Sequence, residues 1–201
     1  AIKTPGIKKE LVTIPYTTAT KIFFSKTQGQ NTIIGVTGSK GKSTTSSLIY
    51  HILKTAGKDV ELLGNIGKPM LEALIKPIPK NRIFVLELSS YQLDDITFSP
   101  DIAVVTNLFP EHLDFHGNLK NYYEAKKNII KYQNKDNYFV YNPQNAEMKK
   151  WAKNYPGKAM SSKDKTFILQ SMKVSEIPLL GEHNQHNIKA AITVAKILEI
   201  P

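Results

Sequence analysis

The stretch from residue 32 to residue 56 constrains the fold of this chain more than any other segment. It begins with a short apolar and β-branched run at residues 32–36, which is typical of a buried strand. A loop with two glycines, Gly38 and Gly41, comes next, and apolar side chains then recur at helical spacing up to Leu53. A strand, a glycine loop and a helix in this order predict a phosphate-binding loop, because backbone N–H groups at the start of the helix can surround an anion.

The loop also carries the side chains that a nucleotide site requires. Lys42 is expected to reach the outer phosphates, and the hydroxyl of Ser43 is expected to bind Mg²⁺. The general pattern G-x-x-x-x-G-K-[ST] is met except at its first position, where this chain has Val36. A glycine turn with a solvated lysine is the alternative. The residues expected to contact the nucleotide are Gly38, Ser39, Lys40, Gly41, Lys42, Ser43 and Thr44.

Further apolar runs predict the rest of a sheet, at residues 60–63, 83–88, 102–106 and 138–141. Helices are expected at residues 17–24, 69–75, 119–132, 146–153 and 187–199. Short strand-like pieces at residues 158–160, 167–169 and 172–174 are expected to form a small antiparallel flap. Nearly continuous apolar strands separated by helices are typical of a parallel sheet covered on both faces. The predicted fold class is therefore α/β: a three-layer phosphate-loop (P-loop) nucleotide-binding domain with a mostly parallel central sheet and the flap.

Composition excludes several classes of protein. A chain of 201 residues can form one α/β domain with a sizeable core, and the absence of cysteine excludes disulfides and thiolate metal sites. The net charge of +10 comes from scattered lysines and not from an arginine-rich run, so we interpret it as a solvated surface that favours anionic nucleotides. No apolar run is long enough to cross a membrane. We expect a cytoplasmic monomer with neither a nucleic-acid nor a membrane partner.

Polar residues follow two of the predicted strands. Glu87 lies inside the apolar run 83–88, at the end where parallel sheets place their ligands. Mg²⁺ on a nucleotide would offset the cost of burying its carboxylate, and the alternative is an ion pair with a nearby lysine. Residues 107–116 carry two histidines and two acids within six residues, which favours metal or phosphate contact for His112. His116 is expected to be structural or to lie on the surface.

Lys126 falls within the apolar stripe of the helix predicted at residues 119–132. That stripe contains Leu119, Tyr122, Tyr123, Ile129 and Ile130. A lysine directed into the core loses its proton readily, and the neutral amine is a nucleophile that could capture CO₂ as a carbamate. The alternative is a side chain that extends past the tyrosines to solvent. Spacing alone leaves both open.

Two asparagines near the last predicted helix are candidate nucleotide contacts. Asn184 is a natural N-cap for that helix, and Asn187 follows it. Side-chain amides are also good partners for the edge of an adenine. Spacing does not decide between capping and nucleotide binding.

Taken together, these motifs resemble the Mur ligase family of cell-wall enzymes along nearly all of residues 30–201. The matching segments occur in the family's order: the loop at residues 37–44, Gly64-Asn65-Ile66-Gly67, the Glu-Leu-Ser-Ser-Tyr-Gln-Leu run at residues 87–93, Asn107 with His112 and Asp114, Tyr122 with Ala125 and Lys126, and residues 181–187. The family's phosphate loop also lacks the first glycine of the general pattern. The run at residues 87–93 most resembles the member that adds D-glutamate to UDP-N-acetylmuramoyl-L-alanine.

The resemblance implies an ATP-driven amide ligase that works through an acyl phosphate. By the family pattern Lys42 stabilises the outer phosphates, Ser43 and Glu87 hold one Mg²⁺, and His112 with a carbamylated Lys126 holds a second. It further implies that Asn184 and Asn187 contact adenine. The residues implied to face the muramoyl substrate are Asn65, Ser89 and Gln92.

The resemblance also implies a domain organisation. Residues 1–26 would be a linker or remnant of an N-terminal UDP-binding domain, residues 27–201 the central ATP-binding domain, and a C-terminal domain would be absent, so the chain alone is expected to be inactive. A folylpolyglutamate-synthase-like ligase is one alternative function, although the run at residues 87–93 speaks against it. A phosphate-loop nucleotide switch or a nucleic-acid-dependent ATPase is another, and predicts salt-sensitive binding of nucleic acid.

Overall fold

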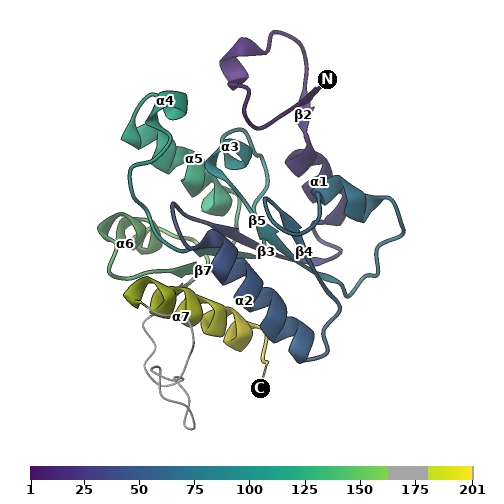
Figure 1. Ribbon diagram of the computed structural model, residues 1–201, viewed down its shortest axis with the longest axis vertical. Helices are drawn as coiled ribbons and strands as arrows, with labels where there is room; N and C mark the ends of the chain where they lie inside the picture. The colour runs from purple at the N-terminus through teal and green to yellow at the C-terminus, as the bar shows by residue number, and fades with distance from the viewer. Residues whose placement is uncertain (163–180, 201) are drawn as a thin grey trace.

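A parallel six-stranded sheet forms the centre of the computed structural model, which describes residues 1–162 and 181–200 (Figure 1). The strand order is β4-β5-β3-β6-β7-β8, and every neighbouring pair is parallel. The strands are β3 (Thr32–Thr37), β4 (Val60–Gly64), β5 (Ile83–Glu87), β6 (Ile102–Val105), β7 (Tyr138–Tyr141) and β8 (Lys158–Ser161). A second, two-stranded parallel sheet joins β1 (Ile2–Lys3) to β2 (Thr17–Thr18) near the N-terminus.

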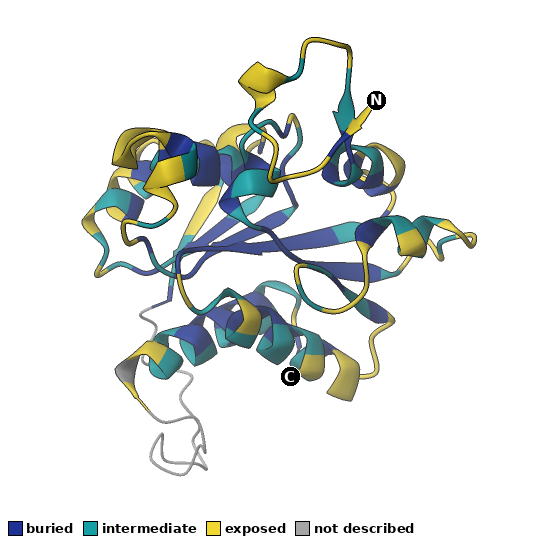
Figure 2. Cartoon of the chain, turned by 45° about the horizontal axis from the view of Figure 1, so that its top comes forward, coloured by how far each residue is buried: buried dark blue, intermediate teal, exposed yellow. Residues whose placement is uncertain are grey.

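Helices cover both faces of the central sheet, which is the most deeply buried layer (Figure 2). On one face α2 (Lys42–Thr55) and α7 (Glu182–Ile197) pack against Ile34, Val85 and Val104. Alternate strand residues point to the other face, whose covering elements are α1 (Ala19–Thr27), the 3₁₀ helix η2 (Met70–Leu74), α3 (Ser90–Leu93), α5 (Leu119–Lys131) and α6 (Ala146–Lys153). Two shorter elements are the 3₁₀ helix η1 (Lys9–Leu11) and α4 (Leu113–His116). The sequence therefore builds two apolar clusters, one on each side of the sheet.

The three-layer α/β prediction is confirmed, and the five strands predicted from apolar runs lie where expected within one residue at each end. The antiparallel flap is wrong for its piece at residues 158–160. That piece forms β8, which pairs in parallel with β7 as the edge of the central sheet. An edge strand has one neighbour and needs no continuous apolar run, so its pattern resembles that of a surface hairpin. The pieces at residues 167–169 and 172–174 lie outside the described residues.

Strand order determines where a ligand can bind. The chain passes from β3 outward to β4, returns to β5 beside β3, and then crosses to β6 on the other side of β3. In open parallel sheets such a reversal opens a crevice at the carboxyl ends of the strands. At those ends Glu87 is the last residue of β5, and Gly38 and Thr106 directly follow β3 and β6. None of the helices within residues 1–162 and 181–200 has the length and apolar character needed to span a bilayer.

Candidate functional site

The glycine loop between β3 and α2 is shaped by two positive backbone angles. Gly38 has φ of 150°, and Gly41, the residue before α2, has φ of 86°. The amide of Ser39 donates to the carbonyl of Asn107 at 2.7 Å, and the Thr106 hydroxyl donates to the carbonyl of Lys40 at 2.6 Å. The loop is thus held against the segment after β6 and leaves the start of α2 open to an anion.

Two lysines from different parts of the chain converge on this loop. Lys42 Nζ donates to the carbonyls of Gly38 at 3.1 Å and Ser39 at 2.9 Å. Lys126 Nζ, from α5, donates to the same Gly38 carbonyl at 2.8 Å. Because one oxygen accepts from both, the two nitrogens lie close together although 84 residues separate them. Lys42 therefore brings positive charge to the carboxyl edge of the sheet, with the amine of Lys126 directly beside it.

Lys126 points into the core, which decides between the two possibilities left open by its spacing. Its residue exposure is 2%, and the amine lies 4.9 Å from the centre of the Tyr122 ring. Burial, together with the positive charge of Lys42, lowers the pKa of Lys126 to about 7, and Glu111 opposes that shift. A fraction of the amine is therefore unprotonated at neutral pH, as a nucleophile requires. Of the predicted stripe, Leu119 is exposed.

Lys126 makes stability depend on pH. Its pKa is about 7 in the folded chain against 10.5 for a free lysine, so between these values the unfolded chain binds more protons and stability rises with pH. We expect the free energy of unfolding of the wild type, relative to Lys126→Met, to increase by about 2 kcal/mol from pH 7 to pH 9. Urea unfolding at constant ionic strength, in bicarbonate-free buffer without nucleotide, measures this. A pH-independent difference would contradict it.

Glu87 ends β5 beside the loop. Its residue exposure is 4%, and Oε2 is buried with no hydrogen-bond partner among residues 1–162 and 181–200. The neighbouring backbone is fixed, because Leu88 N donates to Val36 O at 2.9 Å and Thr37 Oγ1 donates to Leu88 O at 2.7 Å. An unpaired buried oxygen next to a phosphate-type loop is the donor that a magnesium ion would take. In the described part of the chain no lysine forms an ion pair with Glu87, so the structure does not support that alternative.

The segment after β6 brings the histidines to the same edge. His112 is exposed, adopts a left-handed backbone with φ of 53°, and lies with its ring 6.3 Å from that of Tyr122. His116 is buried, with Nε2 3.0 Å from Ser90 Oγ, as expected of a structural residue. Lys42, Glu87, His112 and Lys126 therefore gather at one edge of the sheet.

Two residues of this edge were not among the predicted site residues. The Thr106 hydroxyl binds the loop carbonyl of Lys40, and the Tyr122 hydroxyl lies 2.9 Å from Ser39 Oγ. Ser39 Oγ also accepts from the amide of Phe109 at 2.8 Å. A polar residue at the end of an apolar strand was the available signal for Thr106. For Tyr122 the sequence gives an apolar stripe and a family motif shared with Lys126, but helical periodicity does not show where its hydroxyl lies.

The fit around Gly38 leads to a stability prediction. A Cβ at Gly38 would overlap Thr106 Oγ1 and lie 3.0 Å from Asn107 O, in a backbone conformation unusual for other residues. We expect Gly38→Ala to lower the free energy of unfolding by about 2–3 kcal/mol. Gly6→Ala is the control, because a Cβ there meets no atom within 4 Å. Urea unfolding compares the two, and equal effects would show that the loop is not tightly packed.

The residues implied to face a substrate border this edge. Asn65 is exposed, and its backbone N–H donates to the carbonyl of Glu87 at 3.3 Å. Ser89 and Gln92 form a capping box at the start of α3: Ser89 Oγ accepts from Gln92 N at 3.2 Å, and Gln92 Oε1 accepts from Ser89 N at 2.8 Å. Both side chains are half-buried, so they stiffen the turn that follows Glu87.

The last helix begins earlier than predicted. α7 starts at Glu182 after Gly181, whose φ of 99° makes the turn, so Asn184 lies in the first turn and is not the N-cap. Its Oδ1 accepts from Asn187 Nδ2 at 3.2 Å. Asn187 is buried, and its amide occupies the space that a Cβ on Gly41 would need. Packing of α7 on α2 therefore places this asparagine pair beside the phosphate loop.

These residues fit a nucleotide with its metal. Within residues 1–162 and 181–200, no three His, Cys, Asp or Glu side chains are close enough to hold a metal ion by themselves. A metal here would therefore need other ligands, such as the hydroxyl of Ser43 or phosphate oxygens, beside the unpaired oxygen of Glu87. The glycine loop, the paired lysines and that carboxylate are a donor set for a nucleotide phosphate with Mg²⁺.

The chain is similar to known proteins along almost its whole length. UDP-N-acetylmuramoylalanine--D-glutamate ligase of Oenococcus oeni is 37% identical over 99% of this chain and 50% of its own length. The enzyme of the same name from Streptococcus mutans is 41% identical over 82% of this chain and 40% of its own length. The chain thus spans about half the length of the curated relatives it matches.

Solved structures share the fold. UDP-N-acetylmuramate:L-alanyl-gamma-D-glutamyl-meso-diaminopimelate ligase from Neisseria meningitides matches with a TM-score of 0.69 at 19% identity, over 92% of this chain and 67% of its own. MurF ligase from Thermotoga maritima, solved in complex with ADP, matches with a TM-score of 0.68 at 21% identity, over 90% and 48%. The family model for the Mur ligase middle domain matches residues 36–195. The chain therefore belongs to the Mur ligase family, of which it contains the middle domain.

Proposed function

We propose that this chain is the ATP-binding part of a ligase that adds D-glutamate to UDP-N-acetylmuramoyl-L-alanine in the synthesis of peptidoglycan precursors. The observation that carries the proposal is the convergence of Lys42 and Lys126 on the Gly38 carbonyl, beside the unpaired oxygen of Glu87. In such a cluster the charge of Lys42 stabilises negative charge on a transferring phosphoryl group, and Glu87 and Lys126 would hold metal ions that do the same. The names of the relatives support the choice of substrates.

The proposed roles follow from where each side chain lies. Lys42 binds the outer phosphates, and the glycine loop from Gly38 to Thr44 surrounds the rest of the phosphate chain. Asn184 and Asn187, beside Gly41, contact the adenine. Asn65, Ser89 and Gln92 face the muramoyl group. In the reaction the alanine carboxylate of UDP-N-acetylmuramoyl-L-alanine takes the γ-phosphoryl group of ATP to give an acyl phosphate and ADP, and the amine of D-glutamate then displaces phosphate to form the amide.

Metal binding is proposed for four residues. Ser43 and Glu87 would hold one Mg²⁺, and His112 with a carbamylated Lys126 would hold a second. The lowered pKa of Lys126 favours the neutral amine that carbamylation requires. Bound Mg²⁺ would supply charge neutralisation on the phosphate oxygens. The carboxylate of Glu87 would orient the first ion, and the imidazole of His112 would orient the second.

We also propose that the complete protein is larger than this chain, because the relatives are about twice as long. Residues 1–26 would connect an N-terminal UDP-binding domain to the ATP-binding domain, and a further domain would bind D-glutamate. The chain alone would then be inactive. The proposed protein is a cytoplasmic monomer without a nucleic-acid or membrane partner.

Phosphate release by the full-length protein tests the function. Incubation with ATP, Mg²⁺, UDP-N-acetylmuramoyl-L-alanine and D-glutamate should release phosphate and yield a product whose mass equals the two substrates less one water. Omission of D-glutamate, or its replacement by L-glutamate, is the control. Phosphate release that is stimulated by an oligonucleotide and indifferent to D-glutamate would replace the ligase by a nucleic-acid-dependent ATPase.

A further inference from the structure

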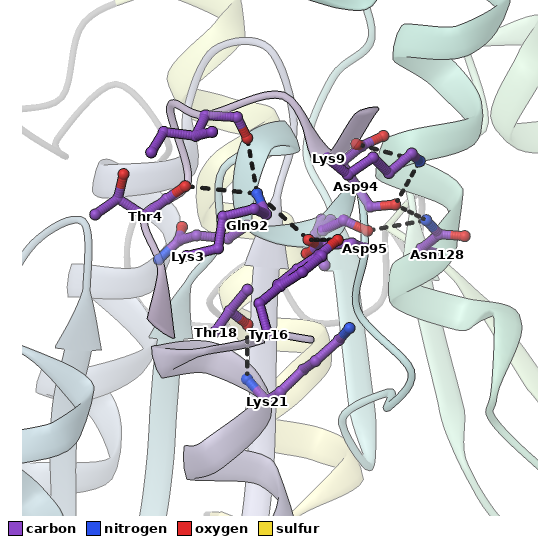
Figure 3. Close-up of polar contacts among 12 residues, drawn as sticks. Lys3, Thr4, Lys9, Tyr16, Thr18, Lys21, Gln92, Asp94, Asp95 and Asn128 are labelled. Carbon is purple, nitrogen blue, oxygen red and sulfur yellow. Dashed lines mark hydrogen bonds and ion pairs between the residues drawn. The ribbon is translucent and has the colours of Figure 1, made fainter. Parts of the chain in front are cut away.

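A buried ion pair joins the N-terminal segment, residues 1–18, to the end of α3 (Figure 3). Lys3 Nζ lies 3.3 Å from Asp95 Oδ2, and the two side chains are only 2% and 6% exposed. The Tyr16 hydroxyl donates to the same oxygen at 3.1 Å. Lys3 Nζ also donates to the carbonyl of Ile7 at 2.9 Å, which folds the segment back on itself. We refer to Lys3, Tyr16 and Asp95 as the clasp.

The clasp fixes the relative position of its two segments more than it stabilises the fold. Asp95 Oδ1 is buried and has no hydrogen-bond partner among the residues that the structure describes, so the ion pair carries a desolvation cost that its attraction only offsets. A buried pair of this kind nevertheless strongly disfavours arrangements that separate its two charges. The adjacent pair contrasts with it: Lys9 and Asp94 also lie 3.3 Å apart, but their side chains are 42% and 19% exposed. An exposed pair contributes little energy and tolerates several arrangements.

The position of the clasp connects it to the substrate side of the site. α3 is only four residues long, with Asp95 just beyond its end and the capping box of Ser89 and Gln92 at its start. The opposite side of this turn is also fixed, because Asn128 of α5 donates to Leu93 O at 2.9 Å. Displacement of the N-terminal segment would therefore act on Ser89 and Gln92 through a short, stiff element.

Nucleotide contacts depend on a different set of interactions. The phosphate loop is held by the segment after β6, through Thr106 and Asn107, and by Lys126 of α5. Lys3 and Tyr16 take part in none of these three interactions, because their own bonds go to Ile7 and Asp95. The clasp residues thus hold the end of α3 and take part in none of the bonds that hold the phosphate loop.

We propose that Asp95 is a positioning residue for the muramoyl substrate. By holding residues 1–18 on the end of α3 through Lys3 and Tyr16, it keeps Ser89 and Gln92 in the orientation that receives this substrate. The inference rests on the proposed function, which assigns those two residues to the muramoyl group. It goes beyond that function by giving a role to a residue outside the proposed substrate contacts.

Asp95→Asn tests the proposal in the full-length protein, with Asp94→Asn as the matched control one residue away. Asp95→Asn should raise KM for UDP-N-acetylmuramoyl-L-alanine about tenfold while kcat and KM for ATP stay within about twofold, because the substitution leaves Lys3 buried without its counter-charge. Asp94→Asn should leave all three constants within about twofold, since its pair is exposed. Adding Lys3→Met to Asp95→Asn should restore part of the loss, because it removes the unpaired charge.

Hydrogen exchange separates this inference from the proposed function. Amides of residues 89–93 should exchange faster in Asp95→Asn than in the wild type, and at the wild-type rate in Asp94→Asn. If the wild type adds no D-glutamate, the proposed function fails; unchanged exchange in Asp95→Asn overturns the clasp in either case. Equal increases in KM for UDP-N-acetylmuramoyl-L-alanine and for ATP would also overturn it, as would an unchanged KM for UDP-N-acetylmuramoyl-L-alanine. Should Asp95→Asn not fold, Tyr16→Phe removes one hydroxyl and should raise the same KM about threefold.

Discussion

Replacement of Lys42 by methionine is expected to lower kcat/KM for ATP about 1,000-fold in the full-length protein, because it removes the charge nearest the outer phosphates. Lys42 Nζ is held over the loop by the carbonyls of Gly38 and Ser39. Methionine keeps the unbranched apolar stem without the terminal ammonium group, and Thr106 and Asn107 still hold the loop, so it should retain its shape. Calorimetric titration with ATP and Mg²⁺, beside the ligase assay, measures the change.

The same substitution has a second consequence that checks the geometry. The charge of Lys42 adds to burial in lowering the pKa of Lys126, so Lys42→Met should raise that pKa towards its ordinary value.

Lys54→Met is the control for ATP binding, because Lys54 is an exposed lysine of the same helix, about 18 Å further along its axis. A Lys42→Met protein that binds ATP like Lys54→Met would show that the loop is not the nucleotide site.

Glu87→Gln is expected to separate stability from activity. Without ligands, this substitution should raise the free energy of unfolding by about 1 kcal/mol. It replaces a buried, unpaired carboxylate by an uncharged side-chain amide, which costs less to bury. With substrates, the loss of a charged metal ligand should lower kcat at least about 100-fold. Higher Mg²⁺ concentrations should recover part of this activity, since the remaining ligands bind the ion more weakly.

Opposite signs make this test specific. A residue that only supports the fold would lose stability and activity together when it is changed. Glu124→Gln is the matched control, because that carboxylate lies on the outside of α5 with a side-chain exposure of 60%. It should change neither quantity. Retention of activity within about threefold in Glu87→Gln would remove this carboxylate from the proposed metal site.

Local sequence patterns predicted most of the sheet. A strand buried on both faces must be apolar at nearly every position, so the runs at β5 and β6 could be recognised from a few adjacent residues. The phosphate loop was recognisable for a similar reason. Its features lie within five consecutive residues: the positive φ angles of Gly38 and Gly41 and the charge of Lys42. The residues at the carboxyl ends of these strands could then be placed at one edge by the general properties of parallel sheets.

Contacts between distant segments decided what the patterns left open. Helical spacing put Lys126 on an apolar stripe, but only the Gly38 carbonyl, 88 residues away, shows that its amine turns inward. β8 was mistaken for part of a flap, since only pairing with β7 makes it an edge strand. The start of α7 was misplaced by five residues, and its packing on α2 sets Asn187 against Gly41.

The chain's own residue order thus determined the sheet, the phosphate loop and the membership of one family, because each depends on short-range periodicity or a short motif. The tertiary structure alone decided the direction of the Lys126 amine, the unpaired state of Glu87 and the burial of Lys3 against Asp95. Those three features depend on desolvation, and how far a group is removed from water is set by every segment that packs around it.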